Sequence, residues 1–298
     1  MAIIYMISVG VIGVIANFIS MAIIIKNQTL HNTFGFLCFS HLVANIGILT
    51  CFCTWPVGMI ISQNNDLAYN PVAKLFGQFT IIFWYSCLFG HLAISINRYI
   101  SIVYPLKAMV FFTTKMTRRG IQALWIISIL VTIPYFWGDS CYLIFNASTF
   151  QWTYSDTQCG QALSYFDFGA GVVICSIAFL IDMITLFDLH NVNSFQALGV
   201  TQGVRRRQNE IRLFTQAFIQ CSIFCFTSFS FHVFTLISDN IWWQFTMVTM
   251  VWISAHSLDG LIVILFHYRS LFAQKVQTLP AITVSTQIQQ ITQSEVNT

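Results

Sequence analysis

Seven apolar segments, each long enough to cross a lipid bilayer, constrain this chain more than any other feature. We expect them at residues 3–25, 34–61, 72–103, 121–137, 163–187, 211–237 and 242–266. A membrane helix needs about 20 apolar residues. Only helices and closed barrels satisfy their backbone hydrogen bonds in lipid, and runs of this length indicate helices. The sequence therefore predicts an all-α membrane protein folded as a seven-helix bundle.

The charge content supports this fold class. Only 8% of the residues are charged and 56% are hydrophobic, whereas a soluble domain carries about 25% charged residues. Most of the surface must therefore contact membrane lipids. The net charge of +3 gives no indication of nucleic-acid binding, which we exclude.

The basic residues predict the orientation of the bundle. Lys and Arg gather in cytoplasmic loops, and a chain with its amino terminus outside places every one of its 13 basic residues except Lys74 on the inner side. An odd number of spans then puts the carboxyl terminus inside. The first segment begins almost at Met1 without a cleavage pattern, so we expect it to act as its own signal anchor.

The connection between the fourth and fifth segments lies outside in this orientation. It contains the sequon Asn146-Ala147-Ser148, which predicts glycosylation of Asn146. It also contains Cys141 and Cys159, which we expect to pair because this side is oxidising. Such a disulfide closes a loop of roughly 17 residues and adds about 3 kcal/mol of stability. Two free thiols are the alternative.

The chain divides into a seven-helix domain, residues 1–268, and a tail, residues 269–298. The start of the tail could form a short amphipathic helix along the inner leaflet. The stretch from Thr278 onward is rich in Ser, Thr and Gln, which predicts disorder.

The end of the third segment carries a recognisable motif. Its residues Asn97-Arg98-Tyr99, followed by Ile102, Pro105 and Leu106, resemble the D-R-Y-x-x-I/V-x-x-P-L pattern of the rhodopsin-like G-protein-coupled receptors. Pro105 should end the helix. Further matches to that family are Asn17 in the first segment, Asn45 in the second, Trp125 in the fourth and Asp259-Gly260-Leu261-Ile262-Val263 at the N-P-x-x-Y position of the seventh.

Three motifs resemble a nematode chemoreceptor group more closely, the serpentine receptor class x. They are Asn32 to Cys38, Gly90 to Arg98 and His256 to Gly260, and the resemblance runs from about Gly10 to Phe272. It implies a plasma-membrane chemosensory receptor, not an enzyme and without cofactor, whose partners are an extracellular small molecule and a heterotrimeric G protein. It leaves the ligand, the G-protein class and the oligomeric state open.

Several departures from the rhodopsin-like pattern limit what carries over. Thr80 stands where amine receptors have an aspartate, which argues against an amine ligand, and the absence of a lysine in the seventh segment excludes a retinal Schiff base. The sixth segment lacks the C-W-x-P motif, and no cysteine lies near Ala73. The usual disulfide to the top of the third helix therefore cannot form.

The resemblance assigns coupling and switching roles to further residues. Asn97, Arg98, Tyr99, Pro105 and Leu106 would contact the G protein, together with the basic cluster Arg205, Arg206 and Arg207, which could instead bind anionic lipid. Asn97 replaces the acid that pairs with the arginine in the family. We therefore expect a weaker resting state, because a neutral partner contributes no Coulomb attraction.

Buried polar residues form the expected switch inside the bundle. Asn17, Asn45 and Asp259 lie in apolar segments, where polar groups almost always face the interior. The resemblance places them around a hydrated, sometimes sodium-bearing pocket, and His256 lies one turn from Asp259 and should pair with it. Interhelical hydrogen bonding without switching is the alternative. Asp182 could contact the sixth helix, or could be a buried, hydrogen-bonded acid.

Other sites receive weaker support. Thr80, Phe83 and Trp84 would contribute to a ligand pocket at the outer half of the third helix. We predict no metal site, because His41, His91, His232 and His256 show no ligand spacing within one helix. The alternative functions are a seven-helix transporter or ligand-gated channel, which should show internal repeats and a polar path, and a truncated, nonfunctional relative.

Overall fold

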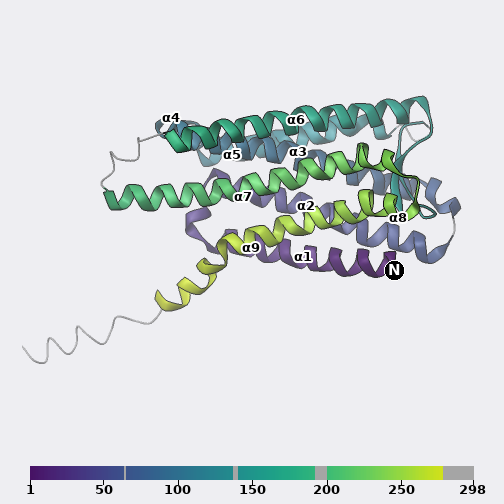
Figure 1. Cartoon of the computed structure of the whole chain (residues 1–298), viewed down its shortest axis with the longest axis horizontal. Helices are drawn as coiled ribbons and strands as arrows, with labels where there is room; N and C mark the ends of the chain where they lie inside the picture. Colours follow the sequence, from purple (N-terminus) through teal and green to yellow (C-terminus); the bar gives the residue numbers. More distant parts are fainter. Residues whose placement is uncertain (64, 137–139, 192–199, 278–298) are drawn as a thin grey trace, which may run out of the picture.

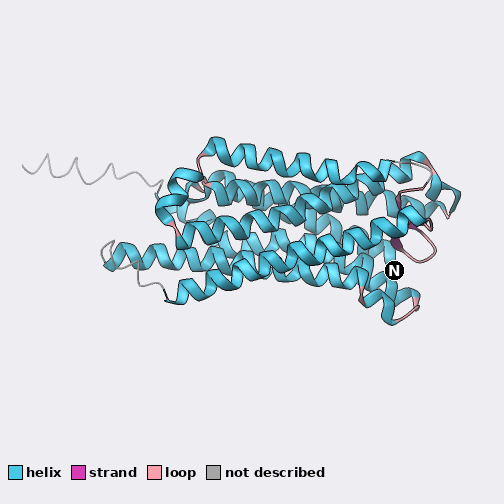
Figure 2. Cartoon of the chain, turned by 90° about the horizontal axis from the view of Figure 1, so that it is seen from above, coloured by secondary structure: helices cyan, strands magenta, loops and turns pink. Residues whose placement is uncertain are grey.

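The computed structural model describes residues 1–63, 65–136, 140–191 and 200–277, with the side chains at 65–66, 190–191, 200–207, 209–210 and 268–277 left out of the description. Seven helices in these ranges are long and apolar enough to cross a membrane. They lie side by side in one elongated bundle (Figures 1 and 2). The predicted fold class is confirmed.

The spans begin and end close to the expected residues. They are α1 (Ala2–Lys26), α2 (Thr33–Ser62), α3 (Pro71–Val103), α5 (Thr114–Thr132) with η3 (Ile133–Phe136), α6 (Gln158–Asn191), α7 (Val200–His232), and the succession α8 (Ile241–Gln244), η6 (Phe245–Met250) and α9 (Val251–Gln277). Short 3-10 turns, η1 (Gln28–Leu30), η2 (Asn65–Tyr69) and η5 (Phe234–Ile237), lie in connections.

Side-chain caps fix several helix starts. The side-chain oxygen Oδ1 of Asn32 accepts from the Gly35 amide at 3.1 Å, and the Asn70 side chain caps α3 in the same way, just before Pro71. The Thr113 hydroxyl caps α5, which begins at Thr114 rather than at the expected residue 121. These caps satisfy amide donors that the first helical turn leaves unpaired, so polar residues outside the apolar runs still belong to helices.

The end of α3 confirms the predicted effect of Pro105. The helix ends at Val103, and Pro105 then occupies the first position of a short helix, α4 (Pro105–Phe111). Proline is tolerated there because the first amide of a helix has no intrahelical acceptor. We call this side of the bundle the Arg98 end.

The opposite side carries a structure that the sequence reading missed. Residues expected to form a plain loop fold into an antiparallel hairpin, β1 (Leu143–Asn146) and β2 (Gln151–Tyr154), with Leu143 opposite Tyr154. Its inner residues are buried in the core. A Cβ atom at Gly77 of α3 would collide with the Leu143 carbonyl, so only glycine lets the hairpin lie directly on α3. This side, which also holds the amino terminus (Figure 2), is the hairpin end.

The helices differ in how much of their surface the bundle covers. In the most apolar stretch of each span, 61% of the residues are buried in α3, but only 17% in the span that contains α5 and 28% in α6. Helix α3 is therefore central, and α5 and α6 are peripheral. Exposed apolar side chains such as Ile126, Leu130 and Leu180 identify the surface that faces lipid in a membrane-spanning chain.

Candidate functional site

Buried polar side chains from four helices meet in the middle of the bundle, and we call them the polar cluster. It consists of Asn17, His41, Asn45, Cys87, His91, His256 and Asp259, all buried. The Asn45 amide nitrogen donates to Asp259 Oδ2 at 3.1 Å and to Asn17 Oδ1 at 3.4 Å. Asn17 Nδ2 in turn donates to the His256 carbonyl at 3.1 Å. The structure thus brings Asn17, Asn45 and Asp259 together.

The expected His256–Asp259 pair does not form. His41 Nε2 lies 2.9 Å from Asp259 Oδ2, and His256 Nδ1 instead lies 2.7 Å from Asn45 Oδ1. The side-chain nitrogen Nδ2 of Asn45 donates to Asp259, so the atom facing His256 is the side-chain oxygen Oδ1, which can only accept. His256 must therefore donate, and it carries its proton on Nδ1. Helix spacing places His256 and Asp259 on one face of α9. Both side chains nevertheless bond to residues of the neighbouring helix α2, His41 and Asn45, rather than to each other.

Two glutamines extend the polar cluster along α7. Gln220 Nε2 donates to the Asp259 carbonyl at 3.3 Å, and Gln216 Nε2 donates to Gln220 Oε1 at 3.4 Å. His267 of α9 lies 3.0 Å from Gln216 Oε1. All three side chains are buried, so a chain of hydrogen bonds runs from Asp259 toward the Arg98 end.

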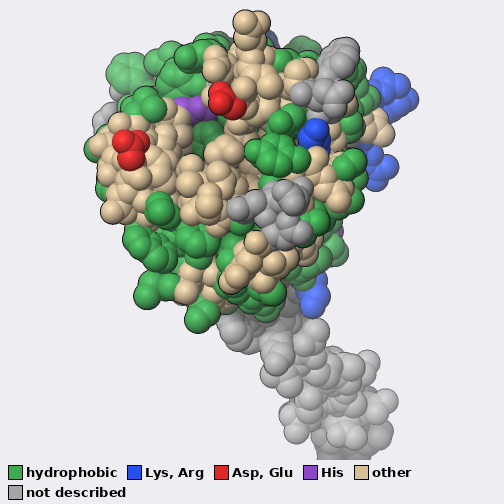
Figure 3. Space-filling model, turned by 90° about the vertical axis from the view of Figure 1, so that its right-hand side faces the viewer, with side chains coloured by type: hydrophobic (Ala, Val, Ile, Leu, Met, Phe, Trp, Pro, Cys, Tyr) green, Lys and Arg blue, Asp and Glu red, His purple; other side chains and the backbone are tan. Residues whose placement is uncertain are grey.

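The hairpin end contains a cavity of about 1070 Å³. The hairpin, α6, α7 and the turns beside them supply its walls. Its lining includes Trp152, Tyr154, Tyr165, Phe168, Phe231 and His232. Figure 3 shows this face, which carries few charged side chains, with part of a histidine visible among polar and apolar groups. Many polar side chains also line it, among them Gln151, Asp156 and Gln161. Small-molecule sites combine apolar or aromatic walls with polar groups that orient the ligand.

Asp167 organises the polar groups beside this cavity. Its carboxylate accepts from Tyr154 at 2.8 Å and from the Trp84 indole at 3.1 Å, and His232 Nε2 lies 3.3 Å away. Burial, and then the negative charge of Asp167, raise the pKa of Tyr154 well above its ordinary value. Tyr154 therefore remains a hydrogen-bond donor. Tyr154 and His232 both line the cavity, whereas Asp167 and Trp84 lie behind them.

Thr80, Phe83 and Trp84, which the sequence predicts to contribute to a ligand pocket, are packed inside the bundle. Thr80 is fully buried and its hydroxyl donates to Phe76 of its own helix, and Phe83 packs edge-on against Trp125 of α5. Trp84 stacks on Phe224 at 4.4 Å. None of them is among the residues that line the hairpin-end cavity.

Trp84 joins the cavity to the polar cluster. Its indole nitrogen contacts Asp167, while its ring packs edge-on against Trp252 and, at 6.5 Å between centroids, against His256. Phe224 of α7 also contacts His256. A continuous set of buried side chains therefore connects the cavity with His256, Asn45 and Asp259.

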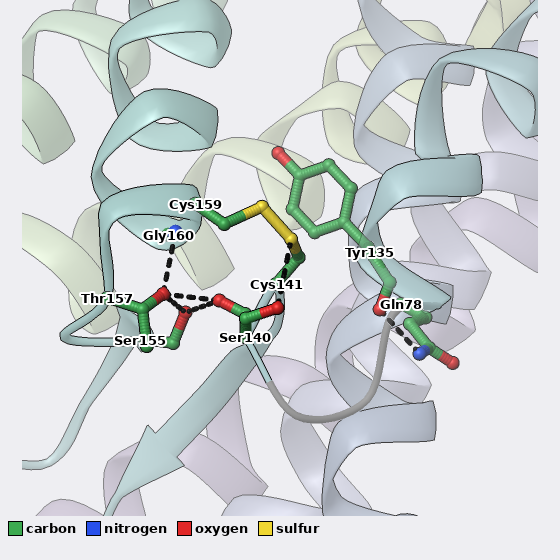
Figure 4. Close-up of a disulfide and its surroundings, with 8 residues drawn as sticks. All are labelled: Gln78, Tyr135, Ser140, Cys141, Ser155, Thr157, Cys159 and Gly160. Carbon is green, nitrogen blue, oxygen red and sulfur yellow. Dashed lines mark hydrogen bonds between the residues drawn. A yellow bond between two sulfur atoms is a disulfide. The ribbon is translucent and has the colours of Figure 1, made fainter.

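Cys141 and Cys159 form a disulfide that ties the start of the hairpin to α6, with their Cα atoms 5.3 Å apart (Figure 4). Around it, the hydroxyls of Ser155 and Thr157 both donate to the Ser140 carbonyl. Asn146 ends β1, and its side-chain oxygen accepts from the Ser148 amide at 2.9 Å. Its glycosylation stays a prediction.

Arg98 is buried rather than extended to the bundle surface. It is 4% exposed, and its guanidinium donates to Asn97 Oδ1 at 3.0 Å and lies 4.1 Å above the Phe34 ring. The two residues line a cavity of about 330 Å³ together with Phe34, Ser101, Pro105 and Met109. Tyr99 packs against Tyr104, and Leu106 is 80% exposed.

Two remaining predicted sites receive different outcomes. Asp182 is fully buried on α6, and its near polar neighbour is Ser95 of α3, although neither carboxylate oxygen has a partner with hydrogen-bond geometry in the described structure. Arg205, Arg206 and Arg207 lie on α7, but their side chains are outside the described part of the chain.

Sequence reasoning missed His41, Asp167, Tyr154, Gln216, Gln220, His232 and His267 as members of these networks. A signal existed for some of them. His41 precedes Asn45 by one helical turn, and Gln216 precedes Gln220 in the same way, so each pair shares a face. Asp167 and Tyr154 had no such signal, because the hairpin that joins them was not foreseen.

Three comparisons with known proteins are informative. The profile of the family described as "Serpentine type 7TM GPCR chemoreceptor Srx" matches residues 7–267. The chain is 23% identical over 278 residues to Serpentine receptor class X 45 of Caenorhabditis elegans, covering 86% of this chain and 76% of the relative. It is 26% identical over 156 residues to Serpentine receptor class X-43 of the same organism, covering 51% and 48%.

A solved structure shows the same fold. The crystal structure of squid rhodopsin superposes with a TM-score of 0.76 at 16% identity, covering 95% of this chain and 86% of that one.

Proposed function

Since the chain belongs to the Srx family of serpentine seven-helix chemoreceptors, we propose that it binds an extracellular small molecule at its hairpin end and activates a heterotrimeric G protein at its Arg98 end. The family consists of receptors rather than enzymes, and the chain is a multi-pass membrane protein. Residence in the plasma membrane, ligand binding at the hairpin end and G-protein binding at the Arg98 end go beyond family membership.

One observation carries this proposal. The hairpin-end cavity and the polar cluster are joined through Asp167, Trp84 and His256, and the cluster continues through Gln220 and Gln216 to His267. A small molecule in the cavity can contact His232 directly, and His232 contacts Asp167. A ligand in the hairpin-end cavity is thus connected, through a continuous chain of side-chain contacts, to His267 near the Arg98 end.

The mechanism is a shift between two states of the bundle. A ligand changes the equilibrium only if it binds one state better than the other. The ligand would favour one arrangement of His232 and Asp167, and α3, α7 and α9 would rearrange through the contacts that link them. Arg98, Asn97 and the exposed Leu106 would then present the G-protein surface, with Arg205, Arg206 and Arg207 as further candidates on α7.

A ligand screen in cells that report G-protein activation tests both halves of the proposal. Once a ligand is found, Arg98→Ala should abolish the response while the receptor still reaches the cell surface. His232→Ala should weaken ligand potency by roughly tenfold or more, as expected when a buried contact worth over 1 kcal/mol is removed.

The control is Ser8→Ala, because Ser8 is exposed and its hydroxyl donates to the Tyr5 carbonyl of the same helix; it should leave the response unchanged. A full response from Arg98→Ala would contradict coupling through the Arg98 end. A ligand-evoked current in cells that lack G proteins would favour a channel instead.

A further inference from the structure

We propose that His41, His91 and Asp259 form a binding site for one divalent transition-metal ion of the zinc class, built from α2, α3 and α9 in the interior of the bundle. One donor atom from each residue lies within 4.8 Å of the others, and all three residues are buried. The sequence analysis predicted no metal site, because each helix supplies only one ligand and the three meet only in the folded bundle.

The chemistry of the donors selects the ion. Two imidazole nitrogens and one carboxylate oxygen suit Zn²⁺ and its neighbours, whereas Na⁺, Ca²⁺ and Mg²⁺ prefer oxygen ligands only. Zinc sites with three protein ligands keep a fourth position for water. In a tetrahedral site, bonds of about 2.0–2.2 Å to each ligand place the donor atoms about 3.3–3.6 Å apart. Small side-chain rotations therefore bring the three donors to coordination distance.

A buried nitrogen of His91 supports the same site. The Nε2 atom of His91 is buried and has no hydrogen-bond partner in the described structure. Its ring packs against His41, with 4.4 Å between centroids, and against Phe224. A buried polar atom without a partner is unfavourable, and coordination of a metal ion would satisfy it.

The remaining groups hold the site in position. Asn45 donates to the Asp259 carboxylate, which is the kind of outer partner that orients metal ligands. The His41–Asp259 contact of 2.9 Å already brings two of the ligands together. A bound ion would replace the proton between them and link α2, α3 and α9 directly.

Zinc binding by the purified full chain in detergent micelles tests the proposal. Calorimetry should find that the unmodified chain binds one Zn²⁺. His91→Phe should weaken this affinity more than about 100-fold, because loss of a residue that only orients a ligand costs about 10–100-fold. This variant keeps an aromatic ring beside Phe224 and removes no hydrogen bond of Nε2. Zn²⁺ should also raise the unfolding temperature of the unmodified chain and not that of His91→Phe, because it binds the folded state.

His232→Phe is the matched control, since it removes the histidine of a second buried His–Asp pair. Among the described residues, this pair is not part of any group of three possible metal ligands. It should bind Zn²⁺ as tightly as the unmodified chain does. Asp259→Asn provides a second test, because it keeps the side-chain shape and removes the charge, and it should also lose the ion. Failure of the unmodified chain to bind Zn²⁺, equal binding by His91→Phe, or equal loss in His232→Phe would overturn the proposal.

Discussion

At the residue scale, the guanidinium of Arg98 donates to a neutral neighbour. Asn97 supplies an amide oxygen at 3.0 Å where an acid would supply a carboxylate. A hydrogen bond between neutral groups contributes about 0.5–1.5 kcal/mol, and one involving a charged group about 1.5–3 kcal/mol. With a charge on one side only, the contact is weaker than the ion pair that an aspartate would form, so under the proposed coupling we expect ligand-free signalling to be elevated.

Asn97→Asp should therefore lower ligand-free G-protein signalling, by about fivefold to tenfold if the added charge stabilises the resting contact by about 1–1.4 kcal/mol. The measurement is second-messenger output without ligand, normalised to surface expression. Asn97→Ala removes the acceptor and should not lower the output. Unchanged signalling in Asn97→Asp would show that this contact does not hold the resting state.

The Tyr154 hydroxyl makes a second residue-scale contact that can be tested. Tyr154→Phe removes one of the donors to the buried Asp167 carboxylate and should lower the free energy of unfolding by about 1.5–3 kcal/mol. Tyr165→Phe is the control, because Tyr165 lines the same cavity but is 76% exposed. Equal stability of the two variants would contradict the role of Asp167.

The same hydroxyl predicts a pH dependence. The folded chain holds the Tyr154 proton more tightly than the unfolded chain does, because burial and then Asp167 raise its pKa. Its contribution to stability is therefore fully present below the ordinary pKa of 10.0 and is lost as the pH rises above it. The stability difference between Tyr154→Phe and the unmodified chain should shrink only in that alkaline range, as denaturant titrations at several pH values would reveal.

At the element scale, α1 and α9 approach each other closely around the polar cluster. The Ser20 hydroxyl donates to the Gly260 carbonyl at 2.7 Å, and Asn17 donates to the His256 carbonyl. A Cβ atom at Gly260 would lie 2.7 Å from the Asn17 backbone nitrogen. The close approach therefore depends on the missing side chain.

Gly260→Ala should force the two helices apart and destabilise the fold by about 1–3 kcal/mol, the usual effect of overpacking. Gly120→Ala is the matched control, since a Cβ atom there has nothing within 4 Å, and alanine favours a helix over glycine by roughly 0.5–1 kcal/mol. Thermal unfolding in micelles would compare them. A Gly260→Ala variant as stable as Gly120→Ala would contradict the close approach.

At the scale of the whole molecule, the basic residues predict which end of the bundle faces outward. Lys74, the one basic residue expected outside, lies at the hairpin end, 4.4 Å above the Tyr142 ring. Two sequons sit at opposite ends with similar local geometry: Asn146 accepts from Ser148 in the hairpin, and Asn27 accepts from Thr29 between α1 and α2.

These two sequons provide a test of orientation. A glycosidase that removes N-linked glycans should increase the gel mobility of the unmodified chain, and Asn146→Gln should abolish that shift. Asn27→Gln should leave the shift intact, because its sequon is predicted to face the cytoplasm. A shift that depends on Asn27 instead would place the hairpin end inside.

The sequence by itself determined the fold class, the approximate helix limits and the end of α3 at Pro105. These follow from local rules, namely the length of an apolar run and the missing amide of proline. It also identified Asn17, Asn45 and Asp259 as interior groups, because a polar residue in an apolar helix must turn away from lipid.

Only the tertiary structure decided the partners of these groups. Asp259 meets His41 rather than His256, and Asp167 gathers Trp84, Tyr154 and His232 from three distant segments. The hairpin, two strands of four residues each, carries too short a pattern to be separated from a loop. Contacts between helices depend on the rotation and depth of each helix, which the packing of the whole bundle sets and no single segment encodes.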